Sequence, residues 1–119
     1  MGTFSEDTKN EMLDSKTFDR VQLHDGDPGA DGTGNVVAGT MKAAVFAAAG
    51  SGARALSADV EWTGLTPLQS ITHFSVWEYN GGAPIFRGKD DITGDQAANA
   101  AGEYTLKGTT TTLTLTDPA

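Results

Sequence analysis

Residues 71–82 read ITHFSVWEYNGG, and this stretch decides the fold class. Its β-branched and aromatic side chains recur at two-residue spacing, which is typical of a strand in a pleated sheet. The stretch ends in an Asn-Gly-Gly turn signal, because asparagine and glycine adopt the positive φ angles that tight hairpin turns need. Residues 84–88 (PIFRG) predict the returning strand. The two segments together predict a β-hairpin.

Short strands are predicted on both sides of this hairpin. Residues 56–62 (LSADVEW) alternate most cleanly, with Leu56, Ala58, Val60 and Trp62 on one face, so we expect a half-buried antiparallel strand there. Further strands are expected at residues 18–24, 41–47, 102–107 and 110–116. The last two are expected to pair, with the threonine-rich one at a sheet edge. About seven or eight short strands predict an all-β fold, an antiparallel β-sandwich in a single domain over residues 1–119.

Residues 1–17 are predicted to form a helical N-terminal arm, with the helix over residues 5–15. Ser5 is a suitable N-cap, and two acidic residues follow it where the helix dipole favours anions. Met12 and Leu13 are the apolar side chains inside the helix. Because so short a stripe cannot hold a helix alone, we expect it to lean on the domain or on a partner.

The composition disfavours several classes of protein. The 119 residues include no cysteine, which excludes disulfides and thiolate-bound zinc and favours assembly in the cytoplasm. The formal net charge of −8 disfavours binding to nucleic acid or to an anionic membrane surface. The chain starts without a signal-peptide pattern, and its longest apolar run, residues 43–49, is far shorter than the ~20 residues that span a bilayer.

The segment 25–35 (DGDPGADGTGN) consists of turn formers and acids, so it predicts a surface loop. Its clustered carboxylates also suggest calcium, because hard cations prefer oxygen ligands. The EF-hand pattern fails, since a glycine and an alanine stand where the third-position acid and the closing glutamate belong. A looser calcium site formed by Asp25, Asp27 and Asp31 is the alternative to a solvated turn.

The residues capable of catalysis form no recognisable motif. His24 and His73 are the two histidines, and both are expected in strands with a neighbouring group as partner rather than in a zinc site. No serine lies in a Gly-x-Ser-x-Gly nucleophile elbow, so we do not expect an enzyme. Trp62, Trp77 and Tyr79 could stack a sugar ring, but their alternation with polar residues favours core positions.

Four stretches carry a family resemblance, in this order along the chain. They are residues 10–14 (NEMLD), 21–29 (VQLHDGDPG), 71–82 and 101–106 (AGEYTL). The series resembles small structural proteins of tailed bacteriophages, described as tail-fibre-like or minor virion proteins. Residues 39–49 depart from the family pattern, in which a more aromatic strand is expected, and this leaves the docking surface open.

The resemblance implies a non-catalytic structural component of the virion, assembled in the host cytoplasm. We expect a capsid decoration or minor capsid protein that docks on the shell and stabilises it. A tail-tip or tail-fibre-associated protein is the alternative, and a carbohydrate-binding β-sandwich module is a further one. The expected partners are the major capsid protein or tail proteins of the same particle and further copies of this chain, without a cofactor, nucleic acid or membrane. The candidate contact residues are Met12, Leu13, Asp27, Pro28, Thr112 and Thr114.

Overall fold

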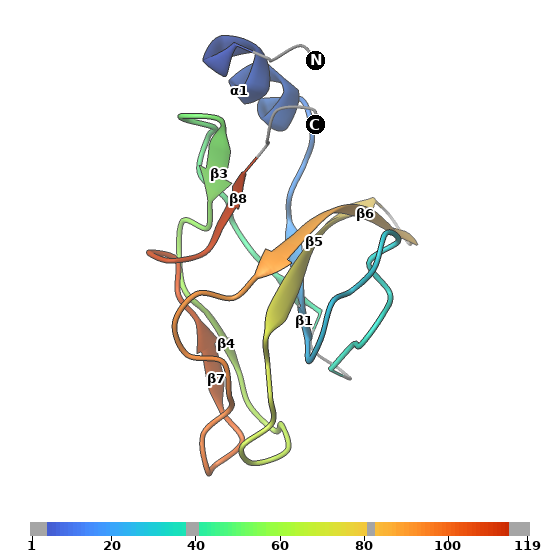
Figure 1. Ribbon diagram of the computed structural model, residues 1–119, viewed down its shortest axis with the longest axis vertical. Coiled ribbons are helices and arrows are strands. Elements are labelled where there is room, and N and C mark those ends of the chain that lie inside the picture. Colours follow the sequence, from blue (N-terminus) through green and yellow to red (C-terminus); the bar gives the residue numbers. More distant parts are fainter. Residues whose placement is uncertain (1–4, 38–40, 81–82, 115–119) are drawn as a thin grey trace.

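The computed structural model describes residues 5–37, 41–80 and 83–114 of the chain. Within them the fold is all-β and antiparallel with one N-terminal helix, so the predicted fold class is confirmed (Figure 1). The elements are α1 (Glu6–Asp14), β1 (Arg20–His24), β2 (Lys42–Ala43), β3 (Ala53–Ala55), β4 (Val60–Trp62), β5 (His73–Asn80), β6 (Ala83–Asp91), β7 (Tyr104–Leu106) and β8 (Thr112–Thr114). No helix in these ranges is long and apolar enough to cross a membrane.

A four-stranded sheet in the order β2-β1-β5-β6 forms the largest layer. Its centre is the predicted hairpin, because β5 pairs with β6 in the expected antiparallel sense. The register shifts between Val76 and Trp77, which marks a β-bulge, and β6 continues past Gly88 to Asp91. The two turn glycines at 81 and 82 lie outside the described residues.

The remaining strands form two short ribbons, β3–β8 and β4–β7. The predicted pairing of residues 102–107 with 110–116 is therefore wrong, since β7 pairs with β4 and β8 pairs with β3. The two ribbons follow one another along the long axis beside the sheet (Figure 1). Between them Leu56 N donates to Thr111 O over 2.9 Å, and Gly108 N donates to Asp59 Oδ1 over 2.8 Å. These contacts hold residues 107–111 as a bridge between the ribbons rather than as a hairpin turn.

The hydrophobic core lies between the sheet and the ribbons. The sheet contributes Val21, Leu23, Phe74 and Val76, and the other segments contribute large side chains that include Phe46, Leu56, Trp62, Ile71, Ile92, Leu106 and Leu113. Two predicted strands are shorter than the sequence suggested. The strand expected over 56–62 bends after Leu56, which leaves Ala58 exposed, and only β4 is regular. The strand expected over 41–47 is reduced to β2, whose two residues are exposed.

The helix leans on the domain, as its short apolar stripe predicted. Ser5 Oγ accepts a hydrogen bond from Thr8 N over 3.1 Å and caps the first turn. Arg54 of β3 donates to the carbonyl oxygens of Leu13 and Lys16 at the other end. Leu13 is buried in the chain's own core, whereas Met12 is 41% exposed, so Met12 is the more accessible of these two candidate contact residues.

Candidate functional site

The outer face of the four-stranded sheet carries the polar residues that could form a site. On β1 and β5 the residues between the core positions are Gln22, His24, Ser75 and Trp77, and all four are buried. They are buried because residues 25–37 fold back across this face. Around these four residues the sheet is therefore covered on both sides, by the core on one and by this loop on the other.

Backbone hydrogen bonds fix the shape of the covering loop. Asp25 N donates to Asn35 O over 2.9 Å, and Gly34 N donates to Pro28 O over 2.7 Å. Pro28 is among the fully buried side chains, so its assignment as an exposed contact residue is wrong. The loop is not simply a solvated turn, because its middle part contacts the sheet.

Gly32 brings the loop against the sheet. Its φ angle is +76°, and a Cβ atom added there would lie 2.4 Å from Cδ1 of the Phe86 ring on β6. Glycine thus serves two needs at this position, a left-handed backbone and room for an aromatic ring. The Phe86 ring in turn contacts Trp77, with 5.3 Å between the ring centroids.

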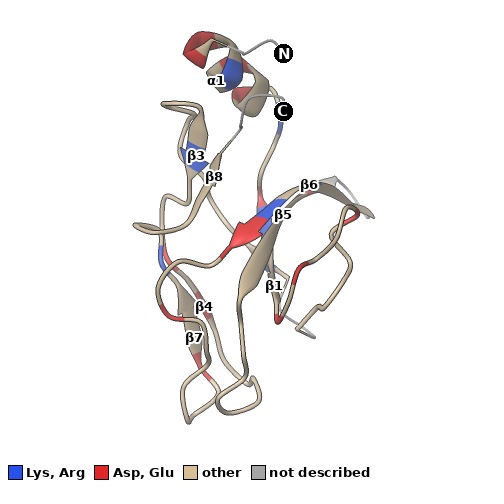
Figure 2. Ribbon diagram, viewed as in Figure 1, with Lys and Arg blue, Asp and Glu red and all other residues tan. Residues whose placement is uncertain are grey.

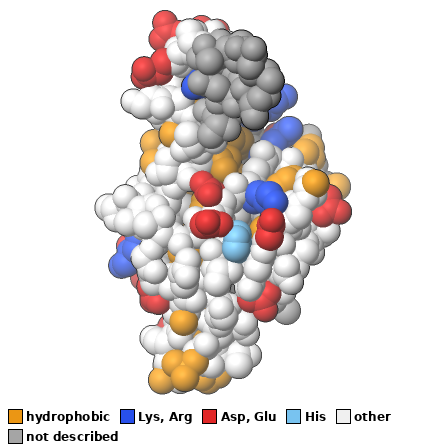
Figure 3. All heavy atoms as spheres, viewed as in Figure 1, with side chains coloured by type: hydrophobic (Ala, Val, Ile, Leu, Met, Phe, Trp, Pro, Cys, Tyr) orange, Lys and Arg blue, Asp and Glu red, His pale blue; other side chains and the backbone are white. Residues whose placement is uncertain are grey.

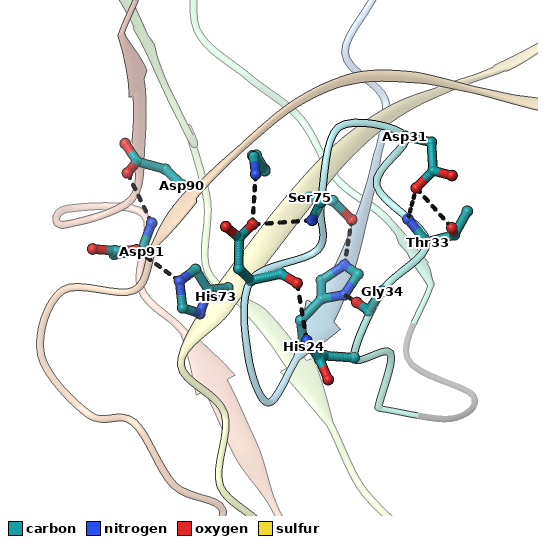
Figure 4. A network of polar contacts seen from close by, with 12 residues as sticks. His24, Asp31, Thr33, Gly34, His73, Ser75, Asp90 and Asp91 are labelled. Carbon is teal, nitrogen blue, oxygen red and sulfur yellow. Dashed lines mark hydrogen bonds and ion pairs between the residues drawn. The ribbon is translucent and has the colours of Figure 1, made fainter.

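A chain of hydrogen bonds runs across the covered face (Figure 4). Trp77 Nε1 donates to Ser75 Oγ over 2.7 Å. Ser75 Oγ lies 2.6 Å from His24 Nε2 (Figure 4). His24 Nδ1 lies 2.7 Å from the carbonyl oxygen of Gly34. Because a carbonyl oxygen can only accept, His24 carries its proton on Nδ1, and its Nε2 accepts from the Ser75 hydroxyl. Each polar group in this network then has a partner, and the network connects the loop to β1 and β5.

Burial lowers the pKa of His24 below its ordinary value, and the hydrogen bond to Gly34 opposes this effect only in part. The neighbouring His73 lowers the pKa further and Asp25 raises it, both by charge interaction. A protonated ring would also donate from Nε2 to Ser75 Oγ, so the hydroxyl proton of Ser75 would lose His24 as its acceptor. The neutral form of His24 therefore fits the network.

His73 is the cross-strand neighbour of His24 and belongs to a second, more exposed group. Its Nε2 lies 2.8 Å from Asp91 Oδ1, and its Nδ1 lies 2.8 Å from Thr72 Oγ1. Both ring nitrogens are thus engaged. Figure 3 shows a histidine side chain at the surface among acidic and basic side chains, and Figure 4 shows His73 beside Asp91, with Asp90 next to it.

The three loop carboxylates proposed for calcium do not gather into one site. Asp27 Oδ1 lies 2.5 Å from Lys89 Nζ and accepts from Gly29 N, and the bond to Lys89 lowers the pKa of Asp27. Asp31 accepts from the hydroxyl and the backbone N–H of Thr33, and these bonds lower its pKa. Among the described residues no three His, Cys, Asp or Glu side chains lie close enough to hold a metal ion.

The rings considered for sugar stacking are mostly inside the protein. Trp62 is 2% exposed and Trp77 is 9% exposed, whereas Tyr79 is 45% exposed and lies under the guanidinium of Arg20. A sugar platform would need two exposed rings on one face, and these three do not supply it. On β8, Thr114 is exposed and Thr112 is half-buried, so Thr114 is the more accessible of the two candidate contacts there.

The chemistry of the covered face is structural. Ser75 is fully buried with its oxygen bonded on both sides, so a substrate could not reach it. The Ser75–His24–Trp77 network was not predicted from the sequence. The signal available in the sequence was the alternation of side chains along each strand. Ser75 and Trp77 lie on the same face of β5, and the register pairs His24 with His73 on that face.

Comparison with protein-family models, with characterised proteins and with solved structures finds no match to this chain.

Proposed function

We propose that this protein is a non-catalytic structural component of a tailed-bacteriophage virion, acting as a capsid decoration or minor capsid protein. In this role it docks on the outside of the shell in many copies and stabilises it by covering surface on the major capsid protein. Multivalent contact makes weak individual contacts sufficient, because neighbouring sites on a lattice are occupied together.

The proposal is supported by the hydrogen bonds of the two histidines and of Ser75, the side chains that could otherwise take part in catalysis. The stretches 21–29 and 71–82, two of those that resemble phage structural proteins, meet in the hydrogen bond between His24 and Ser75. Both histidine rings have both nitrogens engaged. Groups that could catalyse a reaction are thus committed to holding the loop and the sheet together, which suits a scaffold.

The other two resembling stretches also serve the architecture. In residues 10–14, Asn10 Oδ1 accepts from Gly52 N over 2.9 Å, and Asp14 Oδ1 accepts from Ala49 N over 2.8 Å. In residues 101–106, Gly102 contacts the backbone of the facing loop. All four stretches therefore contribute contacts that hold the domain together, and such contacts are what related structural proteins would have in common.

The composition of purified particles tests the proposal. Virions of the phage that encodes this chain are purified, heads and tails are separated, and the copy number of the chain in each is measured by quantitative mass spectrometry. The proposal predicts many copies per head. Finding the chain only in tails would favour the alternative of a tail-tip or tail-fibre-associated protein. Abundant chain in the lysate with none in the particles would refute a virion role.

A further inference from the structure

The middle of the covering loop, residues 26–34, forms a compact flap on the outer face of the sheet. Gly34 N donates to Pro28 O over 2.7 Å within this flap. Asn35 Nδ2 donates to Asp27 O over 3.0 Å and closes it at the base. Both bonds join parts of the loop to each other, so lifting the flap from the sheet does not break them. The flap therefore has the internal support to move as one unit.

Two aromatic rings lie under the flap. A Cβ atom added at Gly32 would lie 2.4 Å from Cδ1 of Phe86, and the ring centroids of Phe86 and Trp77 are 5.3 Å apart. Gly32, Thr33 and Trp77 also line one hollow of about 200 Å³. Trp77 is 9% exposed in this arrangement. Lifting the flap would therefore open this face of Trp77 and Phe86 to water.

His24 is enclosed between the sheet and the flap. Its ring is fully buried, Nδ1 donates to Gly34 O of the flap, and Nε2 accepts from Ser75. A protonated ring keeps the bond to Gly34 but donates to Ser75, so the Ser75 hydroxyl loses its acceptor. A buried cation and a buried hydroxyl without an acceptor are both costly unless water reaches them. Because the core closes the other face of the sheet, water has to enter from the side of the flap.

Charged or titratable side chains lie on each element around His24. They are Asp25, Asp27 and Asp31 in the loop, His73 on β5, and Lys89, Asp90 and Asp91 on β6. Figure 2 shows the acidic positions of the loop and both signs of charge on β6. Burial is the largest influence on His24 and lowers its pKa, which His73 lowers further and Asp25 raises. The bond to Lys89 lowers the pKa of Asp27, so this ion pair stays charged in mild acid. Histidine is the side chain that changes its charge in mild acid, so the experiment has to distinguish the two histidines.

We propose that residues 26–34 are an acid-released flap: protonation of His24 lifts the flap from the sheet and exposes Trp77 and Phe86 while the core stays folded. Release returns His24 to water and to its ordinary pKa of 6.5, whereas the pKa in the closed state is lower. The ratio of released to closed molecules should therefore rise below pH 6.5, by up to about tenfold per pH unit for one proton. This inference goes beyond the proposed function, because it concerns the isolated protein and can fail while a virion location holds.

The two tryptophans of the chain distinguish release of the flap from global unfolding. The Trp77 indole N–H is bonded to Ser75 under the flap, whereas Trp62 is 2% exposed in the core. Proton–deuterium exchange of both indole N–H groups is measured by NMR on the purified full chain, between about pH 7.5 and 5. The protection factor is the exchange rate of a free tryptophan side chain in the same buffer divided by the rate in the protein.

The protection factor of Trp77 should fall below pH 6.5 and should be at least about tenfold lower than that of Trp62 near pH 5. Release of the flap exposes little surface, so exchange of Trp77 should be nearly independent of low urea concentrations, whereas exchange through global unfolding accelerates with urea. A Trp77 protection factor that does not change with pH would overturn the proposal. So would one that falls with urea as steeply as that of Trp62.

Substitution of each histidine identifies the group that releases the flap. His24→Asn does not titrate, so the Trp77 protection factor of this variant should not depend on pH, whatever its level. His73→Gln is the matched control, because it removes the cross-strand neighbour and keeps His24. A pH-dependent fall that persists in His24→Asn, or that disappears in His73→Gln, would contradict the assignment of the switch to His24.

Two glycines of the flap provide a test at neutral pH. Gly32→Ala places a Cβ atom against Phe86, which should push the flap off the sheet. Gly29→Ala is the matched control, because Gly29 shares a positive φ angle, +82° against +76°, but an added Cβ atom meets no atom closer than 4.0 Å. The Trp77 protection factor should be about tenfold or more lower in Gly32→Ala than in Gly29→Ala. Equal protection factors in the two variants would overturn the proposal that this flap covers Trp77.

Discussion

His24 should make this protein lose stability in mild acid. Its ring is fully buried, and it holds the 25–37 loop through Gly34 and the sheet through Ser75. Burial lowers the pKa of His24 in the folded chain below the ordinary value of 6.5. As the pH falls through 6.5, His24 therefore binds a proton in the unfolded chain while it stays neutral in the folded chain.

The sign and size of the effect follow from this difference in proton binding. The unfolded state binds more protons between pH 6.5 and the lowered pKa of the folded state, so the free energy of unfolding rises with pH in that window. One proton gives a slope of at most about 1.4 kcal/mol per pH unit. The stability that comes from neutral His24 is fully present above pH 6.5 and is lost as the pH falls through this window. The carboxylates with lowered pKa values act only at lower pH.

Urea unfolding at several pH values between about 7.5 and 5 measures this slope. His24→Asn keeps a donor for the Gly34 carbonyl but does not titrate, so its stability should be lower at neutral pH and flatter across the window. His73→Gln is the matched control, because it keeps His24 and should keep the acid loss. A wild-type stability that does not change across the window would refute the reasoning. An equal slope in His24→Asn would refute it too.

Two further substitutions test, by urea unfolding, the packing of residues 97–102 against residues 64–70 and the packing of the covered face. Gly102→Ala should destabilise by about 3 kcal/mol or more, because the added Cβ would lie 2.2 Å from the carbonyl oxygen of Leu65 and the backbone has to move. Gly64→Ala shares a positive φ but meets no atom within 4 Å, so it should cost only about 1–2 kcal/mol, and equal losses would contradict the account. Ser75→Ala should cost about 2–4 kcal/mol, since it leaves the buried Trp77 N–H without its acceptor, and a loss under about 1 kcal/mol would contradict the network.

The elements that the sequence predicted correctly depend on local patterns. The β5–β6 hairpin follows from alternation and a turn signal within a single stretch, and the helix follows from its Ser5 cap. The pairing of β7 and β8 was mispredicted because it depends on distant segments. Neighbouring strands 102–107 and 110–116 suggest a hairpin, whereas the core and the Asp59–Gly108 bond align them with β4 and β3 instead.

The candidate site was harder to predict because burial of the outer sheet face depends on the loop. Residues 25–35 have the composition of a solvated turn, yet Pro28 and Gly32 are buried, and Gly32 lies against Phe86 of the sheet. Composition records the exposed acids of the loop but not the direction in which the loop folds.

The position of the chain in a reconstruction of the intact virion tests the central claim most directly. The account predicts density for this domain on the outer surface of the head, repeated at the hexamer or trimer centres of the shell. Density at the tail tip alone would contradict the decoration role.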